Sequence, residues 1–239
     1  MPSEGCSYAF AVGTTPPPWL SIVTEFMDMG SLEDALGREE YAVELSRCTL
    51  KVAICRQIAS GMCYLHESGV LHRDLCPTNI LLGSGWVTKI GDLGLARVKE
   101  ASTPMTRMTL GTPSYIAPEV IDSHAYNTKS DVYSFAVIVW RTVARVEPWE
   151  LTSMSLFSLF SKIKGGERPN VEDFSNEALM EFLASCWEGN PEARPSFQKI
   201  VKWLPDLCLS KEEGCKECKE VRIQSKGGEG DKLNTSLGL

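Results

Sequence analysis

The sequence predicts an α+β protein that is mainly helical, with two short strands near its N-terminus and a small hairpin further along. Three observations predict this class. Apolar residues recur at three- and four-residue spacing over several long stretches, which is the period of a helix with one buried face. Other stretches are short and bounded by turn residues, as strands are. The composition, 43% apolar and 23% charged over 239 residues, is typical of a globular domain with an ordinary core.

Two strands are predicted at residues 8–12 and 20–24, on either side of three consecutive prolines at 16–18. Proline fixes its backbone φ and has no amide hydrogen, so this connection is extended rather than helical. Two strands without further partners are at best marginally stable in water. We therefore expect this pair to be mobile or to borrow a partner.

Five helices are expected after these strands. They occupy residues 30–36, 49–66, 131–145, 176–188 and a stretch that starts near 196. Ser31 and Ser175 are the predicted N-caps of the first and fourth helices. In the second helix the apolar residues trace one buried face: Leu50, Ile54, Ile58, Met62 and Leu65. The third helix is apolar almost all round, so we expect it to be buried on most sides.

Irregular segments separate and follow these helices. Residues 80–82 and 87–90 predict a hairpin around a Gly-Ser-Gly turn. Residues 92–119 are rich in Ser, Thr, Met and Gly without periodicity, which predicts a long loop of the functional kind. Residues 206–239 lack an apolar pattern and are rich in Lys, Glu and Gly, so we expect a disordered tail.

Charge and cysteine content limit the partners and the compartment. The formal net charge of −7 argues against nucleic acid, because the neutralisation of phosphates requires a basic face. No signal sequence is visible, and no apolar run is long enough for a membrane segment in this chain. Together with nine cysteines that show no framework pattern, these features favour a reducing, cytoplasmic compartment. The sequence does not indicate an oligomeric state.

Residues 215–218 form a C-x-x-C motif, and Cys208 lies nearby in the sequence. Zinc binding or redox chemistry would need more ligands at set spacing. Because the surrounding tail is charged, the favoured interpretation is a solvated segment without a metal.

Three motifs in fixed order carry the chemistry. They are H-R-D-L-C-P-T-N at 72–79, D-L-G at 92–94 and A-P-E at 117–119. Phosphoryl transfer needs a group that orients the acceptor hydroxyl, oxygen ligands for Mg²⁺, and positive charge near the phosphates. Asp74 fits the first role, because a carboxylate in a tight loop can accept the hydroxyl proton. Asn79 and Asp92 fit the second role, because both offer hard oxygen ligands.

This ordered set resembles the signature of eukaryotic protein kinases, and residues 8–204 resemble their C-terminal lobe. The stretches I-V-T-E-F-M at 22–27 and C-W-E-G-N-P-E-A-R-P at 186–195 are similar to the tyrosine-kinase-like group of serine/threonine kinases. The resemblance implies transfer of the ATP γ-phosphoryl group to Ser or Thr hydroxyls of a protein substrate, with ATP and Mg²⁺ as cofactors. It divides the chain into a remnant of N-lobe strands and hinge at 1–27, a kinase C-lobe at 28–205 and the tail at 206–239.

The resemblance also assigns roles on the nucleotide side. Thr24 would be the gatekeeper, and the backbones of Glu25 and Met27 would meet the adenine edge. Leu81 would form the floor under adenine. Asn79 and Asp92 would hold Mg²⁺ and, through it, the nucleotide.

Further roles follow for the activation segment and the scaffold. The resemblance places four residues in the activation machinery: Arg73, Thr106, Thr109 and Thr112. Arg73 precedes the catalytic aspartate as in kinases whose activation segment is ordered by a phosphate, and Ser102, Thr103, Thr106 and Thr109 are the candidate acceptors. Glu119 and Arg194 would form a buried ion pair, and Asp131 would hold the catalytic loop.

Two departures from the family pattern leave two hypotheses open. Cys76 stands where these kinases have a lysine, and losing that charge could cost about 10²–10³ in rate. The residues before position 8 contain no G-x-G-x-x-G, no V-A-x-K and no helix with a partnering glutamate. One hypothesis is a serine/threonine kinase that needs an N-lobe missing from this chain, which would be a fragment, splice form or incomplete gene model. The other is a degenerate kinase fold that serves as a protein-binding scaffold.

Overall fold

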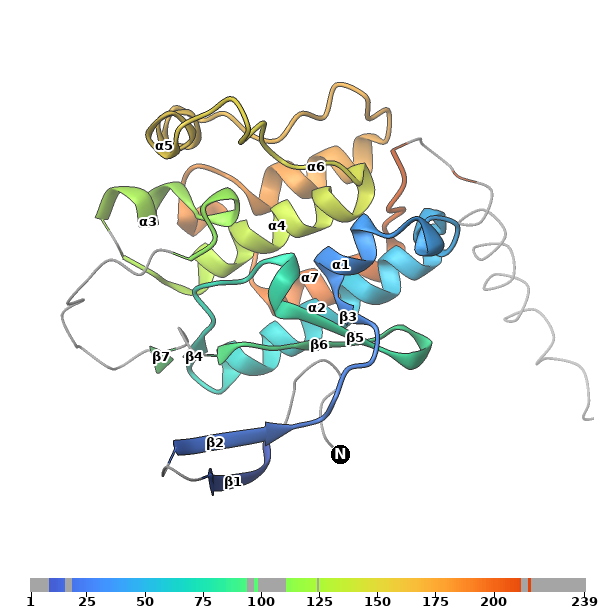
Figure 1. The fold of residues 1–239 in the computed structure, drawn as a ribbon. Coiled ribbons are helices and arrows are strands. Elements are labelled where there is room, and N and C mark those ends of the chain that lie inside the picture. Colours follow the sequence, from blue (N-terminus) through green and yellow to red (C-terminus); the bar gives the residue numbers. More distant parts are fainter. Residues whose placement is uncertain are drawn as a thin grey trace, which may run out of the picture.

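The computed structural model describes residues 9–15, 19–93, 97–98, 111–123, 125–211 and 215. Seven α-helices lie within these ranges: α1 (Leu32–Gly37), α2 (Cys48–Glu67), α3 (Pro118–Ser123), α4 (Thr128–Ala144), α5 (Leu156–Lys164), α6 (Glu177–Cys186) and α7 (Phe197–Trp203). The helices pack into one body, and the strands lie along its lower edge in Figure 1. The prediction of an α+β chain with mostly helical content is confirmed.

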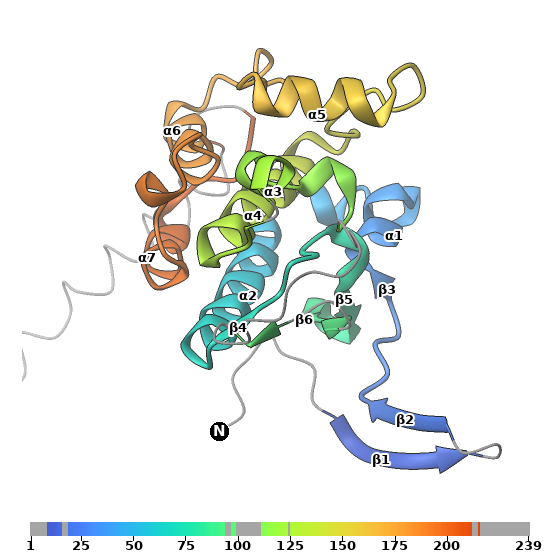
Figure 2. The ribbon, with the colours of Figure 1, turned by 90° about the vertical axis from the view of Figure 1, so that its left-hand side faces the viewer.

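The strands of the described residues form three small antiparallel sheets. They are β1 (Ala9–Thr15) with β2 (Trp19–Thr24), β5 (Ile80–Gly83) between β3 (Gly30–Ser31) and β6 (Val87–Ile90), and β4 (Val70–Leu71) with β7 (Arg97–Val98). The β1–β2 hairpin projects away from the helices in both views (Figures 1 and 2). The middle sheet lies against α2 and contains the hairpin that the sequence predicts at 80–90.

Helix ends follow their capping residues more closely than the apolar pattern predicts. α4 begins at Thr128 rather than at Asp131, because the side chain of Asn127 accepts the N–H groups of Lys129 and Ser130. The predicted N-cap of α6 is wrong: Asn176, not Ser175, accepts the N–H of Leu179. A helix therefore starts where a side chain satisfies its free N–H groups, which need not be where its apolar face starts.

Two helices, α3 and α5, were not predicted from the sequence. In α5 only Leu159 and Ile163 are buried, whereas Phe157 is 84% exposed. Ser155 caps this helix through the N–H of Ser158. One buried residue per turn in a nine-residue helix is too short a pattern to be recognised by its period.

The core joins the long helices close to the functional motif. Ile54 and Ile58 of α2 are completely buried, and Phe135 of α4 packs edge-on against Phe197 of α7 with 5.4 Å between ring centroids. His66, near the C-terminal end of α2, makes a similar contact with Phe197 at 5.1 Å. This packing brings the end of α2 beside the start of α4. Among the described residues no helix is both long and apolar enough to cross a membrane.

Candidate active site

The motif at 72–79 is anchored by the first turn of α4. Asp131 is buried there, and its two carboxylate oxygens accept the backbone N–H groups of His72 and Arg73 at 3.1 and 3.0 Å. The same carboxylate lies 2.8 Å from Nε2 of His66, near the end of α2. The two central helices therefore fix the start of the loop together.

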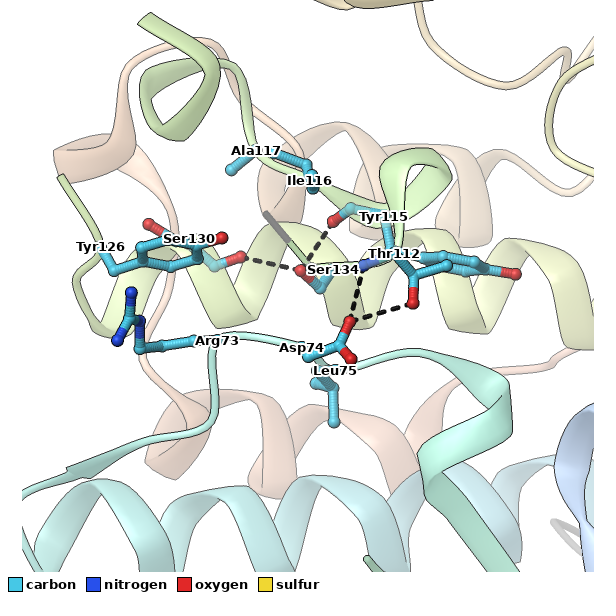
Figure 3. Close-up of a pocket in the computed structure, with 11 residues that line it drawn as sticks. Arg73, Asp74, Leu75, Thr112, Tyr115, Ile116, Ala117, Tyr126, Ser130 and Ser134 are labelled. Atoms are coloured by element: carbon cyan, nitrogen blue, oxygen red, sulfur yellow. Dashed lines mark hydrogen bonds between the residues drawn. The ribbon is translucent and has the colours of Figure 1, made fainter. Parts of the chain in front are cut away.

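Arg73 turns the chain sharply at this point. Its backbone is left-handed, with φ +71°, a conformation that costs a non-glycine residue about 1–3 kcal/mol. The bond from its N–H to Asp131 helps to hold this turn. Its guanidinium group lies over the ring of Tyr126, 4.6 Å from the centroid, and Figure 3 shows the two side chains together.

Asp74 lies at the centre of the site. Its Oδ1 accepts the N–H and the hydroxyl of Thr112 at 2.7 and 3.0 Å, as Figure 3 shows. Its Oδ2 accepts a bond from Nδ2 of Asn79 at 3.1 Å, and the same nitrogen donates to the Asp74 carbonyl at 2.8 Å. A Cβ atom at Gly111 would lie 2.8 Å from Asp74 Oδ1, so only glycine fits there without a shift. A carboxylate held in one orientation can orient a hydroxyl group and accept its proton.

Asn79 and Asp92 are linked through the backbone. The N–H of Gly91 donates to the carbonyl of Asn79 at 2.8 Å, and Nε2 of the buried His72 lies 3.1 Å from the carbonyl of Gly91. Asp92 follows directly and is exposed. Because the amide nitrogen of Asn79 faces Asp74, its Oδ1 is the atom that can face a cation. Amide and carboxylate oxygens are the donors that Mg²⁺ takes in proteins, so these residues fit that ion.

The residues predicted to meet adenine lie in the middle sheet, as Leu81 does, or contact a residue of it, as Glu25 and Met27 do. Leu81 is partly buried on β5 and pairs with Lys89 of β6. The side chain of Lys89 forms an ion pair with Glu25, which is exposed. The side chain of Met27 is buried, and its carbonyl accepts the N–H of Gly30 at 3.3 Å.

Glu119 and Arg194 form a two-pronged ion pair. Their paired atoms lie 2.8 and 2.9 Å apart, and Arg194 is only 1% exposed. Arg194 also donates to the carbonyls of Glu188 and Lys129 at 2.7 and 2.9 Å, while Ser130 donates to Glu119 at 2.9 Å. Removing one partner of such a buried pair leaves an uncompensated charge.

Cys76 is buried two residues after Asp74. Its Sγ lies 3.1 Å from the hydroxyl oxygen of Thr78 and 3.3 Å from that of Thr112. Burial raises the pKa of the Cys76 thiol, so the group is neutral at neutral pH. Thr112 therefore contacts both the carboxylate of Asp74 and this thiol.

The sequence profile of the protein tyrosine and serine/threonine kinase family matches residues 7–204. The chain belongs to this family. It is 35% identical over 219 residues to serine/threonine-protein kinase STY46 of Arabidopsis thaliana, covering 92% of this chain and 37% of that protein. It is 39% identical over 223 residues to human receptor-interacting serine/threonine-protein kinase 1, covering 84% and 32%, and 35% identical over 199 residues to the dual specificity protein kinase shkB of Dictyostelium discoideum, covering 81% and 30%. The chain thus spans about a third of the length of these relatives.

Membership of the kinase family makes Cys76 the main chemical departure in the loop. Where the resemblance expects a positively charged lysine, this chain has a neutral thiol that is hydrogen-bonded to Thr112. No charge at this position can therefore neutralise a transferring phosphate. The sequence identified the substitution but gave no sign of the link between Cys76 and Thr112, which are 36 residues apart.

Some of the predicted site residues meet in the structure, whereas others lie outside the described residues. Five of them share one network of hydrogen bonds and backbone contacts: Arg73, Asp74, Asn79, Thr112 and Asp131. The candidate phosphorylation sites Ser102, Thr103, Thr106 and Thr109, and Gly94 of the D-L-G motif, lie outside the described residues. Sequence reasoning missed Gly111 and Tyr126. Gly111 could have been suspected from its place at the start of G-T-P-S-Y, whereas no local pattern marks Tyr126.

Proposed function

We propose that the chain is the C-lobe part of a serine/threonine protein kinase, which transfers the γ-phosphoryl group of ATP to Ser or Thr hydroxyls of protein substrates. The observation that carries this proposal is the orientation of Asp74 by Thr112 and Asn79. A pocket opens beside this carboxylate, lined among others by Arg73, Gly111, Thr112, Tyr115 and Tyr126 (Figure 3). We assign the acceptor hydroxyl to that pocket.

In this proposal each polar residue has one task. Asp74 orients the acceptor hydroxyl and accepts its proton as the phosphoryl group is transferred. Oδ1 of Asn79 and the carboxylate of Asp92 hold Mg²⁺, which neutralises charge on the phosphate oxygens when bound. The backbones of Glu25 and Met27 contact the adenine edge, and Leu81 lies beneath the ring.

For function, we propose the division of the chain that the family resemblance implies. Residues 1–27 serve as the last N-lobe strands and the hinge, 28–205 as the C-lobe, and 206–239 as a tail. Turnover requires a Gly-rich loop and a phosphate-binding lysine that these 239 residues do not contain. We therefore propose that efficient phosphoryl transfer requires a protein in which these residues are joined to a Gly-rich loop and a phosphate-binding lysine.

Serine/threonine specificity and a place in the tyrosine-kinase-like group are also proposals. The sequence G-T-P-S-Y-I-A-P-E at 111–119 and the names of the relatives, most of them serine/threonine kinases, support both. The relative named as a dual specificity kinase makes tyrosine the competing acceptor. We place the protein in the cytoplasm, supported by ATP as co-substrate and by the free thiols of the described cysteines.

A protein-binding scaffold is the second candidate, and Cys76 is the observation that favours it. A neutral, buried thiol contributes no charge to a transferring phosphate. A scaffold would keep the substrate-docking surface while no longer turning over ATP.

The decisive experiment has two steps. First, the transcript upstream of Met1 is read for an in-frame Gly-rich loop and lysine. The protein that includes them and its Asp74→Asn variant are then assayed for phosphate transfer to Ser, Thr and Tyr peptides. We expect Ser and Thr phosphorylation that Asp74→Asn abolishes, with Mg-ATP binding retained in calorimetry. Equal turnover by the Asp74→Asn variant would remove the assigned role. A verified start at Met1 with no binding of Mg-ATP would favour the scaffold.

A further inference from the structure

Three cysteines from distant parts of the sequence meet at the N-terminal end of α2. Cys48 is the first residue of that helix, Cys208 follows the short 3₁₀ turn at Leu204–Asp206, and Cys215 lies seven residues further on. The sulfur of Cys208 lies 3.6 Å from that of Cys48 and 3.4 Å from that of Cys215. All three sulfur atoms lie within 4.8 Å of one another. This cluster is separate from the motif at 72–79 and has no task in phosphoryl transfer.

The spacing of the sulfur atoms fits a shared metal ion. A disulfide would bring two sulfurs to about 2.05 Å, much closer than any pair here. Zinc–sulfur bonds of about 2.3 Å in a tetrahedron place the sulfurs about 3.8 Å apart. The separations of 3.6 and 3.4 Å between Cys208 and its two neighbours are close to that edge length. A small outward movement would therefore admit the ion.

Two of the three sulfurs are held in place by the fold itself. Cys48 and Cys208 are 3% and 9% exposed, and the N–H of the fully buried Leu209 donates to the sulfur of Cys48 at 3.0 Å. The side chain of Asn176 donates to the carbonyls of Cys208 and Ser210 at 2.8 and 3.0 Å. An amide donating to a sulfur is the kind of outer contact that orients a metal-binding thiolate. The fold thus fixes two of the ligand atoms, the sulfurs of Cys48 and Cys208, before an ion binds.

A helix end and a lysine border the cluster. Cys48 begins a helix of 20 residues, whose N-terminal end carries a partial positive charge. Lys51, one turn further along α2, is buried, and burial lowers the pKa of its ammonium group. A zinc ion with several thiolates carries net negative charge, which a buried ammonium partly offsets.

The C-x-x-C motif adds a sequence argument for a metal site. Cys215 is the first cysteine of this motif, and Cys218, the second, lies outside the described residues. C-x-x-C is a spacing that recurs in structural zinc sites, where two ligands come from one turn of chain and two from elsewhere. The sequence interpretation set the motif aside for want of further ligands. The fold supplies a further ligand, Cys48, which is 160 residues from Cys208 in the sequence and therefore belongs to no local motif.

We propose that Cys48, Cys208 and Cys215 bind one Zn²⁺ ion, which fastens the C-terminal segment to the start of α2. Binding converts three thiols to thiolates, releases three protons and forms three zinc–sulfur bonds, so no oxidant or reductant takes part. Figure 1 shows the red segment after α7 passing this end of α2, opposite the end that carries β4 and the motif at 72–79. The proposal goes beyond kinase function and does not depend on it.

The test uses the full chain, purified with reductant, and measures zinc content, competition with a chromophoric chelator, and the absorption of the Co²⁺-loaded protein. We expect one tightly bound zinc per chain, Co²⁺ bands typical of a tetrahedral thiolate site, and a melting temperature that rises with zinc. Cys215→Ser should weaken zinc binding more than about 10–100-fold, the loss expected when a mere outer-shell contact is removed. Cys48→Ser should do the same.

Cys63→Ser is the matched control, because Cys63 lies on the same helix, is partly exposed and contacts Glu67 rather than the cluster. It should leave zinc binding unchanged. Since Cys48 is buried, its variant could lose zinc through misfolding, so the variant at Cys215, which is only partly buried, keeps the test independent of folding. The proposal is overturned if the chain holds no stoichiometric zinc, if Co²⁺ lacks thiolate bands, or if Cys215→Ser binds as tightly as the natural chain. A Cys208–Cys215 disulfide in the protein from reducing cells would overturn it equally.

Discussion

The two sides of the candidate active site differ in how firmly this chain holds them. The proposed acceptor side, which we define as Arg73, Asp74, Asn79 and Thr112 with Asp131, is held together by hydrogen bonds of 2.7–3.1 Å, and Asp131 ties it to the first turn of α4. The nucleotide side, defined as Glu25, Met27, Leu81 and Asp92, includes two exposed carboxylates and borders a projecting hairpin. The fold therefore holds the residues of the proposed acceptor side more firmly than those of the proposed nucleotide side.

The largest expected effect comes from the ion pair that supports the acceptor side. Arg194→Ala should lower the free energy of unfolding by about 3–5 kcal/mol, because it leaves the carboxylate of Glu119, whose side chain is only 17% exposed, without its charged partner. Urea denaturation followed by circular dichroism measures this loss. The control is Arg38→Ala, which removes an exposed pair with Glu40 at 3.6 Å and should cost less than about 1 kcal/mol. Similar losses in the two variants would contradict the prediction.

A direct comparison of the two sides uses one aspartate from each. Asp131→Ala should cost about 2–3 kcal/mol, because the N–H groups of His72 and Arg73 lose their acceptor. Asp92→Ala, on the exposed side, should change stability by no more than about 0.5 kcal/mol. Thermal unfolding of both variants measures the difference. If Asp92→Ala lowered stability as much as Asp131→Ala, the two sides would not differ in how firmly the fold holds them.

Steric pressure on Asp74 should have a smaller effect. Gly111→Ala places a Cβ 2.8 Å from both Asp74 Oδ1 and the Arg73 carbonyl, and should destabilise the fold by about 1–3 kcal/mol. In a catalytically competent form it should also lower kcat more than it changes the KM for ATP. Gly37→Ala is the control, since no atom lies within 4 Å of its added Cβ, and it should be neutral or slightly stabilising. If the two variants proved equally stable, the backbone around Gly111 would be able to move away from the added Cβ atom at no cost, contrary to the prediction.

The smallest effect is a pH dependence at Cys76. Burial raises the pKa of its thiol above the usual 9.0, so above that pH the unfolded chain releases a proton that the folded chain retains. The stability that this thiol contributes is therefore fully present at neutral pH and declines as the pH rises past 9.0. Cys76→Ser should flatten the fall of unfolding free energy on the alkaline side, measured by denaturation at a series of pH values. Parallel curves for the two proteins would count against a buried, neutral thiol.

Local patterns predicted the features that depend on local physics. The four-residue period of Ile54 and Ile58 located α2 to within a residue at each end, because one buried face requires that period. The short α5 was missed, since Leu159 and Ile163 alone are too weak a pattern. Asn127 moved the start of α4 because capping is decided by a side chain outside the apolar face.

The linear sequence determined the kinase family, the identity of the motif residues such as Asp74, and the helices with a long apolar period, since all of these are properties of neighbours along the chain. Only the tertiary structure decided that Thr112 bonds to Asp74 across 38 residues and that Cys48 meets Cys208 across 160. Such contacts depend on which faces of α2 and α4 pack together and where the chain returns after α7. That choice minimises exposed apolar surface over the whole molecule, and no short stretch of residues records it.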